Sequence, residues 1–465
     1  NNVDVADMYA EKISTKNNKL YYEYEAQLRP VTEKKITINY LENGKLIAKE
    51  FKTYFTHHGP IMAQRDGKWI SLKSNNRSMN SLVQSWVRTK SQDFEAYKKA
   101  MDLKANTSNN TVYADSKGNI AYWHGNFIPV RDKNLNWSKV VDGSTATTEW
   151  KGLHDVSQMV HLYNPTNGWL QNCNSTPYSV AGENSPKEEN YLPYMAPDGE
   201  NFRGINAVRL FSQGNQYTLD KIIADGYNSK LSAFEILIPT LIAAFENNLK
   251  SENPSYKDLS EPIAVLKNWD YYANANSVAT TLANEWAFKL DPVLQRVYID
   301  EGELDQVENT KLFAKNATQE QLLPQLQMVI NELKTKFGTW QIPWGDLNRF
   351  QRASGDIDLV YNDAAESLPI GNTSVLWGCL PAFKSSYQKD TKKRYGYSGN
   401  SFICAVEFGP KIKAKSLLAG GNSGDPKSKH FNDQAEMYQK GQFKDVLFYK
   451  EDVLKNAERT YHPGE

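Results

Sequence analysis

Residues 36–71 alternate between apolar and polar side chains with the period of two that is typical of β-strands. Three such runs follow one another, ITINY, KLIAKEFKTYFT and GKWISL. Turn-forming residues separate them, ENG at 42–44 and DG at 66–67. The pattern therefore predicts a meander of antiparallel strands in this part of the chain.

A helix and a hairpin are predicted next. The segment SQDFEAYKKAMDL places Phe94, Tyr97 and Met101 at helical spacing, and Ser91 is expected to cap this helix. The strand-like segments NTVYAD and IAYWH follow and are joined by SKGN at 116–119, where Gly and Asn tolerate a positive φ.

The apolar period becomes helical between 218 and 337, with the long striped runs AFEILIPTLIAAFENNL and SVATTLANEWAFKL. Ser232 with Glu235, and Thr318 with Gln321, have the spacing of capping boxes. Strand character returns beyond Trp340, in SVLWGCL and SFICAVEF. Strands on both sides of a helical block favour one mixed domain over 1–465, with 218–337 as a helix-rich insertion.

Composition narrows the classes of partner. The chain has 465 residues, of which 40% are hydrophobic, so it can bury a large core. Lys+Arg and Asp+Glu both number 54, which leaves no global field to attract nucleic acid or anionic lipid. No apolar run approaches the length of a membrane span, and a small-molecule partner is expected. A chain that begins with Asn1 is expected to be processed or to come from something longer.

The three cysteines have no CxxC spacing, which argues against a thiolate metal site or a dithiol redox centre. Cys379 and Cys404 lie in two apolar runs that could pair as neighbouring strands, and we predict a disulfide between them if the protein is exported. Cys173 would then be the free thiol.

Three segments have candidate chemistry. The first, YNPTNGWLQNCNSTP at 163–177, is either a rigid loop braced by its own amides or the source of an amide that donates to an oxyanion. The second, AGGNSGDPKSKHFNDQ at 419–434, lacks the spacing of a phosphate-binding loop, and its glycines are interpreted as turn formers. The third is the pair His57 and His58. Adjacent strand residues point to opposite faces, so this pair is expected to be structural and not to chelate one ion.

Residue spacing leaves the reaction open, because carboxylates and aromatics are plentiful enough for an acid/base glycosidase. The chain nevertheless resembles the large chain of the penicillin acylase family over almost its whole length, from VDVADMYAEKI to GGNSGDPKSKHFNDQAEMYQKGQF. The matching segments keep the family's order: THHGPI, NTVYADSKGNIAY, EWKGL, YNPTNGW, NCNSTP, FRGINAVRL and IPWGDLNRF.

The resemblance implies a fold and a mechanism. The fold would be the α+β, four-layer αββα sandwich of N-terminal-nucleophile hydrolases, with 218–337 as a helical excursion. Such enzymes mature from a precursor by autoproteolysis into a small (alpha) and a large chain. The freed N-terminal Ser is the nucleophile, and its α-amino group is the general base. By the family pattern that Ser, with one backbone oxyanion donor, lies upstream of Asn1, and the chain alone is expected to be inactive.

Site residues are implied by the same resemblance. Asn174 in NCNSTP matches the family's oxyanion-hole amide, and Arg203 in FRGINAVRL matches an active-site arginine for which a structural salt bridge is the alternative. The opening DVAD resembles a calcium-binding segment, with Asp4, Ala6 and Asp7 as ligands through two carboxylates and a backbone carbonyl. The alternative for Asp7 is a capping role.

The expected activity is hydrolysis of a small-molecule acyl-amide, such as a penicillin or cephalosporin side chain or an acyl-homoserine lactone, by a periplasmic or secreted bacterial enzyme. A different class stays open: a non-catalytic periplasmic protein that binds small molecules on an acylase scaffold. The identity of the residue that begins the mature large chain discriminates between the two.

Overall fold

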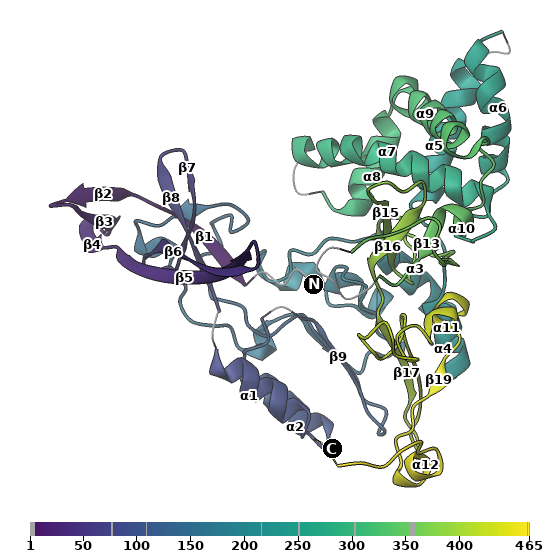
Figure 1. The fold of residues 1–465 in the computed structure, drawn as a ribbon. Helices are drawn as coiled ribbons and strands as arrows, with labels where there is room; N and C mark the ends of the chain where they lie inside the picture. The colour runs from purple at the N-terminus through teal and green to yellow at the C-terminus, as the bar shows by residue number, and fades with distance from the viewer. Residues whose placement is uncertain are drawn as a thin grey trace. The chain divides into compact units, whose positions relative to one another are not determined.

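The computed structural model describes residues 5–75, 78–107, 109–214, 216–249, 252–301, 304–353, 359–462 and 464, with 295–301 described by their backbone only. The chain folds into two compact units. The first unit comprises 1–172 and 183–198, and the second comprises 173–182 and 199–465. Figure 1 shows the strand-rich beginning of the chain in purple and the helical block in teal and green.

The first unit is built from short, mostly antiparallel sheets. One sheet has the order β11-β1-β8-β7, in which β1 pairs antiparallel with β8 and parallel with β11. The others have the orders β2-β3-β4, β5-β6 and β12-β10-β9. The strands are β1 (Ala6–Glu11), β2 (Ile13–Lys16), β3 (Lys19–Tyr24), β4 (Gln27–Pro30), β5 (Thr32–Glu42), β6 (Lys45–Phe55), β7 (Ile61–Arg65), β8 (Lys68–Ser74), β9 (Thr111–Ala114), β10 (Ile120–Trp123), β11 (Val141–Asp142) and β12 (His161–Tyr163).

The predicted hairpin is confirmed by β9 and β10. The predicted meander is confirmed only in part: ITINY and KLIAKEFKTYFT pair as β5 and β6, but GKWISL lies in β8, in the sheet β11-β1-β8-β7. The turn between β5 and β6 has positive φ at Asn43 (51°) and Gly44 (76°), as a two-residue hairpin turn requires. The helix predicted after residue 91 is α2 (Phe94–Met101), next to α1 (Met79–Arg88). Its cap is not Ser91 as predicted: Asp93 takes that place, and its carboxylate accepts a hydrogen bond from the N–H of Ala96 at 2.8 Å. Asp93 directly precedes Phe94, the first residue of the helix, whereas Ser91 lies two residues further from it.

The expectation that His57 and His58 point to opposite faces is wrong. Strand β6 ends at Phe55 and β7 begins at Ile61, so both histidines lie in the intervening turn. The two imidazole rings lie side by side, with their centroids 3.8 Å apart. The alternation rule applies to extended strands and fails where the backbone turns.

The second unit contains the predicted helical block, which is confirmed. Its helices are α4 (Leu219–Gly226), α5 (Phe234–Asn248), α6 (Pro254–Lys267), α7 (Val278–Glu301), α8 (Gln306–Asn316) and α9 (Gln319–Phe337). Apolar faces of α5 to α9 enclose one core around Trp286, whose indole N–H donates to the carbonyl oxygen of Leu322 at 3.0 Å. Figure 1 shows α5 to α9 gathered into a bundle, with α4 outside it.

Of the two predicted capping boxes, one is confirmed and one is wrong. Thr318 and Gln321 form the reciprocal box at the start of α9. Ser232 does not cap α5, because its hydroxyl donates to the side-chain oxygen of Asn206 at 2.5 Å, and the helix begins after Ala233 without a side-chain cap. A tertiary hydrogen bond has replaced the local one.

The remaining strands of the second unit form two sheets, with the orders β14-β13-β16-β15 and β17-β18-β19. The strands are β13 (Asn348–Phe350), β14 (Leu368–Pro369), β15 (Phe383–Tyr387), β16 (Arg394–Gly399), β17 (Phe402–Glu407), β18 (Lys413–Leu418) and β19 (Lys444–Asp445). The other helices are α3 (Phe202–Phe211), α10 (Trp344–Leu347), α11 (Ala435–Lys440) and α12 (Lys450–Lys455). No helix of the described residues is long and apolar enough to cross a membrane.

The predicted disulfide between Cys379 and Cys404 is wrong, since both residues are free thiols. SFICAVEF does form a strand, β17, but SVLWGCL forms a 3-10 turn at Val375–Trp377 and does not pair with it. Cys379 is buried, whereas Cys404 is exposed. A disulfide needs Cβ atoms within about 4.5 Å, which two such segments do not provide.

Candidate active site

Asn174 lies at an exposed position of the loop that begins the second unit, in a left-handed conformation with φ of 54°. Asparagine is among the few residues that adopt this conformation readily. The amide of Asn201 holds the loop backbone, because its Nδ2 donates to the carbonyl oxygens of Cys173 at 3.2 Å and of Asn174 at 3.0 Å. The position of Asn174 is therefore fixed from outside its own loop.

Asn201 is also the N-cap of helix α3. Its Oδ1 accepts the backbone N–H groups of Arg203 at 3.1 Å and of Gly204 at 3.0 Å. Gly204 lets the helix approach the loop closely, since a Cβ there would lie 2.7 Å from the hydroxyl oxygen of Ser175. One amide thus joins the start of α3 to the loop of Asn174.

The two residues predicted for the site, Asn174 and Arg203, are brought together. Arg203 Nη2 donates to Asn174 Oδ1 at 2.8 Å, although the two residues are 29 positions apart. A guanidinium has only donors, so it selects the oxygen end of the amide. The donor end, Nδ2, is thereby turned away from Arg203.

The surroundings of Asn174 favour negative charge. The N-terminus of α3 and the Arg203 guanidinium both place positive potential beside the amide. Cys173, the adjacent residue, is not a nucleophile of this site: burial raises the pKa of its thiol to about 11, so it stays protonated at neutral pH. A fixed neutral donor beside positive potential can stabilise an oxyanion.

Reasoning from sequence missed Asn201, which supplies most of the hydrogen bonds that position the site. A signal was present, because an Asn directly before an apolar-periodic segment is a typical N-cap. The start of α3 is fixed further by Asp305, whose Oδ2 accepts the N–H of Glu200 at 3.1 Å and whose Oδ1 caps α8 through the N–H of Glu308 at 2.8 Å.

The expected calcium ligands can be tested only in part, because Asp4 lies outside the described residues. Asp7 is buried, and its Oδ2 accepts hydrogen bonds from Arg131 Nε at 2.8 Å and Trp150 Nε1 at 2.5 Å. Its Oδ1 is buried and accepts no hydrogen bond from the described residues. Burial raises the pKa of Asp7, and Arg131 offsets this only in part. A cation at Oδ1 would stabilise the ionised form, so the chemistry of Asp7 fits a calcium ligand.

Comparisons with known proteins show the family of the chain. The sequence pattern of the penicillin amidase family matches residues 1–455. Penicillin G acylase of Escherichia coli is 28% identical over 281 residues, which cover 57% of this chain and 30% of that protein. The acyl-homoserine lactone acylase PvdQ of Pseudomonas fluorescens (strain Pf0-1) is 23% identical over 477 residues, which cover 93% of this chain and 57% of that protein.

Among solved structures, the thermostable penicillin G acylase from Alcaligenes faecalis superimposes with a TM-score of 0.67 at 18% identity, covering 99% of this chain and 86% of that chain. This similarity confirms the predicted α+β fold of the N-terminal-nucleophile hydrolase type. The chain spans between 30% and 57% of the length of these two curated relatives.

Proposed function

Because the chain belongs to the penicillin amidase family, we propose that it is the greater part of the large chain of an amidase that cleaves acyl-amide bonds. The substrate class is a linear acyl-amide, in line with relatives named as penicillin G acylase and acyl-homoserine lactone acylase. The nucleophile would be an N-terminal Ser from the precursor segment upstream of Asn1, exposed by autoproteolysis. The partner would be a small chain from the same precursor, and the location would be periplasmic or extracellular.

One observation carries this proposal: Arg203 holds the oxygen end of the Asn174 amide at 2.8 Å. A loop amide that only braced its own backbone would need no charged partner from another helix. Here the guanidinium takes the oxygen end of the amide, which leaves the N–H groups as the donor end. Such a preorganised donor is what an oxyanion hole requires.

The reaction would proceed by acyl transfer. The Ser hydroxyl oxygen would attack the amide carbon, its proton would pass to the α-amine, and the C=O electron pair would move onto the carbonyl oxygen. Asn174 Nδ2 would donate to that oxyanion together with a backbone N–H of the upstream segment. Collapse of the intermediate would break the C–N bond, with the proton passing to the leaving amine. Water would then hydrolyse the acyl-enzyme to the carboxylic acid.

We also propose that calcium has a structural role in the first unit, bound by the Asp7 carboxylate, the Ala6 carbonyl oxygen and Asp4. The buried Oδ1 of Asp7, which lacks a hydrogen bond from the described residues, supports this proposal. Oxygen ligands in irregular geometry suit Ca²⁺. The ion would neutralise charge and hold the start of β1, with no part in the acyl transfer.

The test is Asn174→Ala in the complete, matured enzyme. Loss of one oxyanion donor is expected to lower kcat by roughly 100- to 1,000-fold, about 2.7 to 4 kcal/mol, with KM nearly unchanged. The matched control is Asn164→Ala. Asn164 is also exposed and left-handed, with φ of 47°, and its Oδ1 accepts the N–H of Ile120 at 2.8 Å.

The control separates catalysis from bracing of a loop. Asn164→Ala is expected to lower the melting temperature and to leave kcat of the folded enzyme close to the wild-type value. If Asn174→Ala behaves in the same way, Asn174 does not form an oxyanion hole. If the matured wild-type protein binds acyl-amides but hydrolyses none, the chain belongs to a binding protein and the enzymatic proposal fails.

A further inference from the structure

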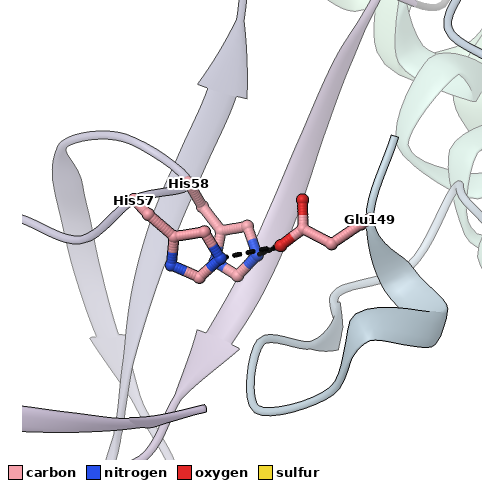
Figure 2. A group of neighbouring side chains, drawn as sticks. All are labelled: His57, His58 and Glu149. Atoms are coloured by element: carbon pink, nitrogen blue, oxygen red, sulfur yellow. Dashed lines mark hydrogen bonds and ion pairs between the residues drawn. The ribbon is translucent and has the colours of Figure 1, made fainter. Parts of the chain in front are cut away.

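Three side chains of the first unit, those of His57, His58 and Glu149, converge on one point (Figure 2). Glu149 Oε1 lies 2.7 Å from His57 Nε2 and 3.0 Å from His58 Nε2. The three atoms all lie within 4.8 Å of one another, a spacing that one metal ion could span. The three residues belong to the first unit, whereas Asn174 and Arg203 belong to the second.

The fold holds both imidazole rings in place. The turn that carries them needs a glycine after His58, because a Cβ at Gly59, with φ of 148°, would overlap the carbonyl oxygen of Leu72. The ring of Tyr9 stacks on that of His58, with centroids 3.8 Å apart and planes inclined by 9°. The rings are therefore oriented by packing and not by an ion alone.

The outer nitrogen of each ring is already engaged. His58 Nδ1 lies 2.8 Å from Glu11 Oε1, and His57 Nδ1 lies 3.1 Å from the hydroxyl oxygen of Tyr22. A metal-bound histidine typically donates its second N–H to a carboxylate or similar acceptor, which fixes the tautomer and turns the other nitrogen to the ion. His58 has this arrangement, because its Nδ1 faces the carboxylate of Glu11.

The centre of the cluster requires positive charge. When His58 Nδ1–H donates to Glu11, the neutral ring presents a lone pair from Nε2 to the carboxylate oxygen of Glu149, and two acceptors then face each other at 3.0 Å. Only a proton or a metal ion between them resolves the repulsion.

Lys73 does not supply the positive charge between His58 Nε2 and Glu149 Oε1. Its Nζ lies 2.8 Å from the other oxygen, Glu149 Oε2, and so leaves Oε1 to the two histidines. The side chains of His57 and Glu149 are 26% and 22% exposed, which gives water and ions access from one side. Solvent access, three potential ligand atoms and hydrogen-bond partners that orient the two imidazole rings therefore occur together in this cluster.

We propose that His57 Nε2, His58 Nε2 and Glu149 Oε1 bind one divalent ion of the Zn²⁺ class, with water as the fourth ligand. Two imidazoles and one carboxylate form a typical zinc ligand set, whereas Ca²⁺ prefers oxygen ligands only. Bonds of about 2.0 to 2.2 Å in tetrahedral geometry place ligand atoms about 3.3 to 3.6 Å apart, so Glu149 Oε1, at 2.7 and 3.0 Å from the two nitrogens, would retreat by roughly 0.3 to 0.9 Å. The ion would fasten the turn of His57 and His58 to the segment that carries Glu149.

The probe is Zn²⁺ itself, titrated by calorimetry into the chelator-treated, dialysed protein in a buffer that contains calcium. One equivalent is expected to bind in the wild type, and His57→Ala should weaken binding by at least about tenfold. His57 is partly exposed, so this variant is expected to fold. His430→Ala is the matched control, because His430 is an exposed histidine whose Nδ1 lies 2.7 Å from a carboxylate oxygen of Asp433, in a pair and not a triad.

Cobalt gives an independent reading, since Co²⁺ in a four-coordinate nitrogen and oxygen site absorbs strongly in the visible range. The band is expected in the wild type and in His430→Ala, and it should be lost in His57→Ala and in Glu149→Gln. Absence of saturable Zn²⁺ binding in the wild type would overturn the proposal. Equal binding by wild type and His57→Ala, or loss of the site in His430→Ala, would overturn it as well.

Discussion

The two compact units bury charge to very different extents. Among the described residues of the first unit, the buried acidic and basic side chains are those of Asp7, Glu11, His58, His124, Arg131, His154 and Asp198. In the described part of the second unit they are Glu285 and Arg394, which pair with each other at 2.9 Å. The helical core of the second unit is instead apolar, with Leu237, Leu282 and Leu326 at 0% exposure.

This difference implies two kinds of stability. An apolar core depends on volume and shape, and it tolerates exchanges between hydrophobic residues of similar size. A core with buried charge depends on each group keeping its partners, because an unpaired buried charge costs several kcal/mol. It also implies that Asn174 and Arg203, whose hydrogen bond is exposed and which belong to the second unit, can be altered without unfolding its apolar core.

The largest effect is expected for Glu11→Ala in the first unit. Glu11 Oε1 accepts hydrogen bonds from Thr56 at 2.7 Å and Ser71 at 2.6 Å, and it lies 2.8 Å from His58 Nδ1. Removal of the carboxylate leaves these buried groups without their acceptor and should lower the free energy of unfolding by about 3 to 5 kcal/mol. Urea denaturation measures the loss.

Leu326 supplies the comparison in the second unit. Glu11→Met should remain strongly destabilising although it keeps the volume, whereas Leu326→Met should cost less than about 1.5 kcal/mol. Equal losses for the two methionine variants would show that the units do not differ in the way we infer.

The contrast between local and long-range contacts explains which elements the sequence could predict. The helical block from 218 to 337 and the Thr318 capping box depend on local periodicity, and both are confirmed. The cap at Ser232 failed because its hydroxyl bonds to Asn206, a partner 26 residues away. The strand predicted at SVLWGCL was wrong because an apolar run does not by itself distinguish a strand from a 3-10 turn.

The residues of the candidate sites also divide into those that sequence motifs indicate and those that depend on long-range packing. Family motifs located Asn174 and Arg203, but Asn201, which positions both, was missed because its role depends on the packing of two segments. His57 and His58 were singled out but interpreted as structural, and Glu149, which lies beside both, was missed although the motif EWKGL contains it. No spacing rule connects residues that are 92 positions apart and meet through a turn.

A smaller effect is expected from removal of calcium. At an ion concentration 100 times its Kd, binding stabilises the folded state by about 2.7 kcal/mol, so EGTA should lower the melting temperature of the wild type. Asp7→Asn should abolish this sensitivity. Glu285→Gln, which alters a buried carboxylate that is paired with Arg394 in the second unit, should lose stability but keep the response to EGTA. A wild-type melting temperature that EGTA does not change would refute the calcium proposal.

The smallest effect, and the one that separates chemistry from folding, is expected for Arg203→Ala in the matured enzyme. The variant loses a charge-assisted hydrogen bond that orients Asn174, worth about 1.5 to 3 kcal/mol, so kcat should fall by about 10- to 150-fold. The melting temperature should change little, because the bond between Arg203 and Asn174 is exposed. Arg203→Lys should restore part of the activity, since an ammonium can still select the amide oxygen but lacks the planar fork.

Because Arg203 is proposed to act through Asn174, the two substitutions should not be additive. In an Asn174→Ala background the amide is already gone, so Arg203→Ala should lower kcat by only a small further factor. The interaction free energy from this double-mutant cycle should approach the whole effect of Arg203→Ala alone. If the two losses add, Arg203 acts on the substrate independently of Asn174. The second unit would then carry two separate functional groups, in place of one oriented amide and its support.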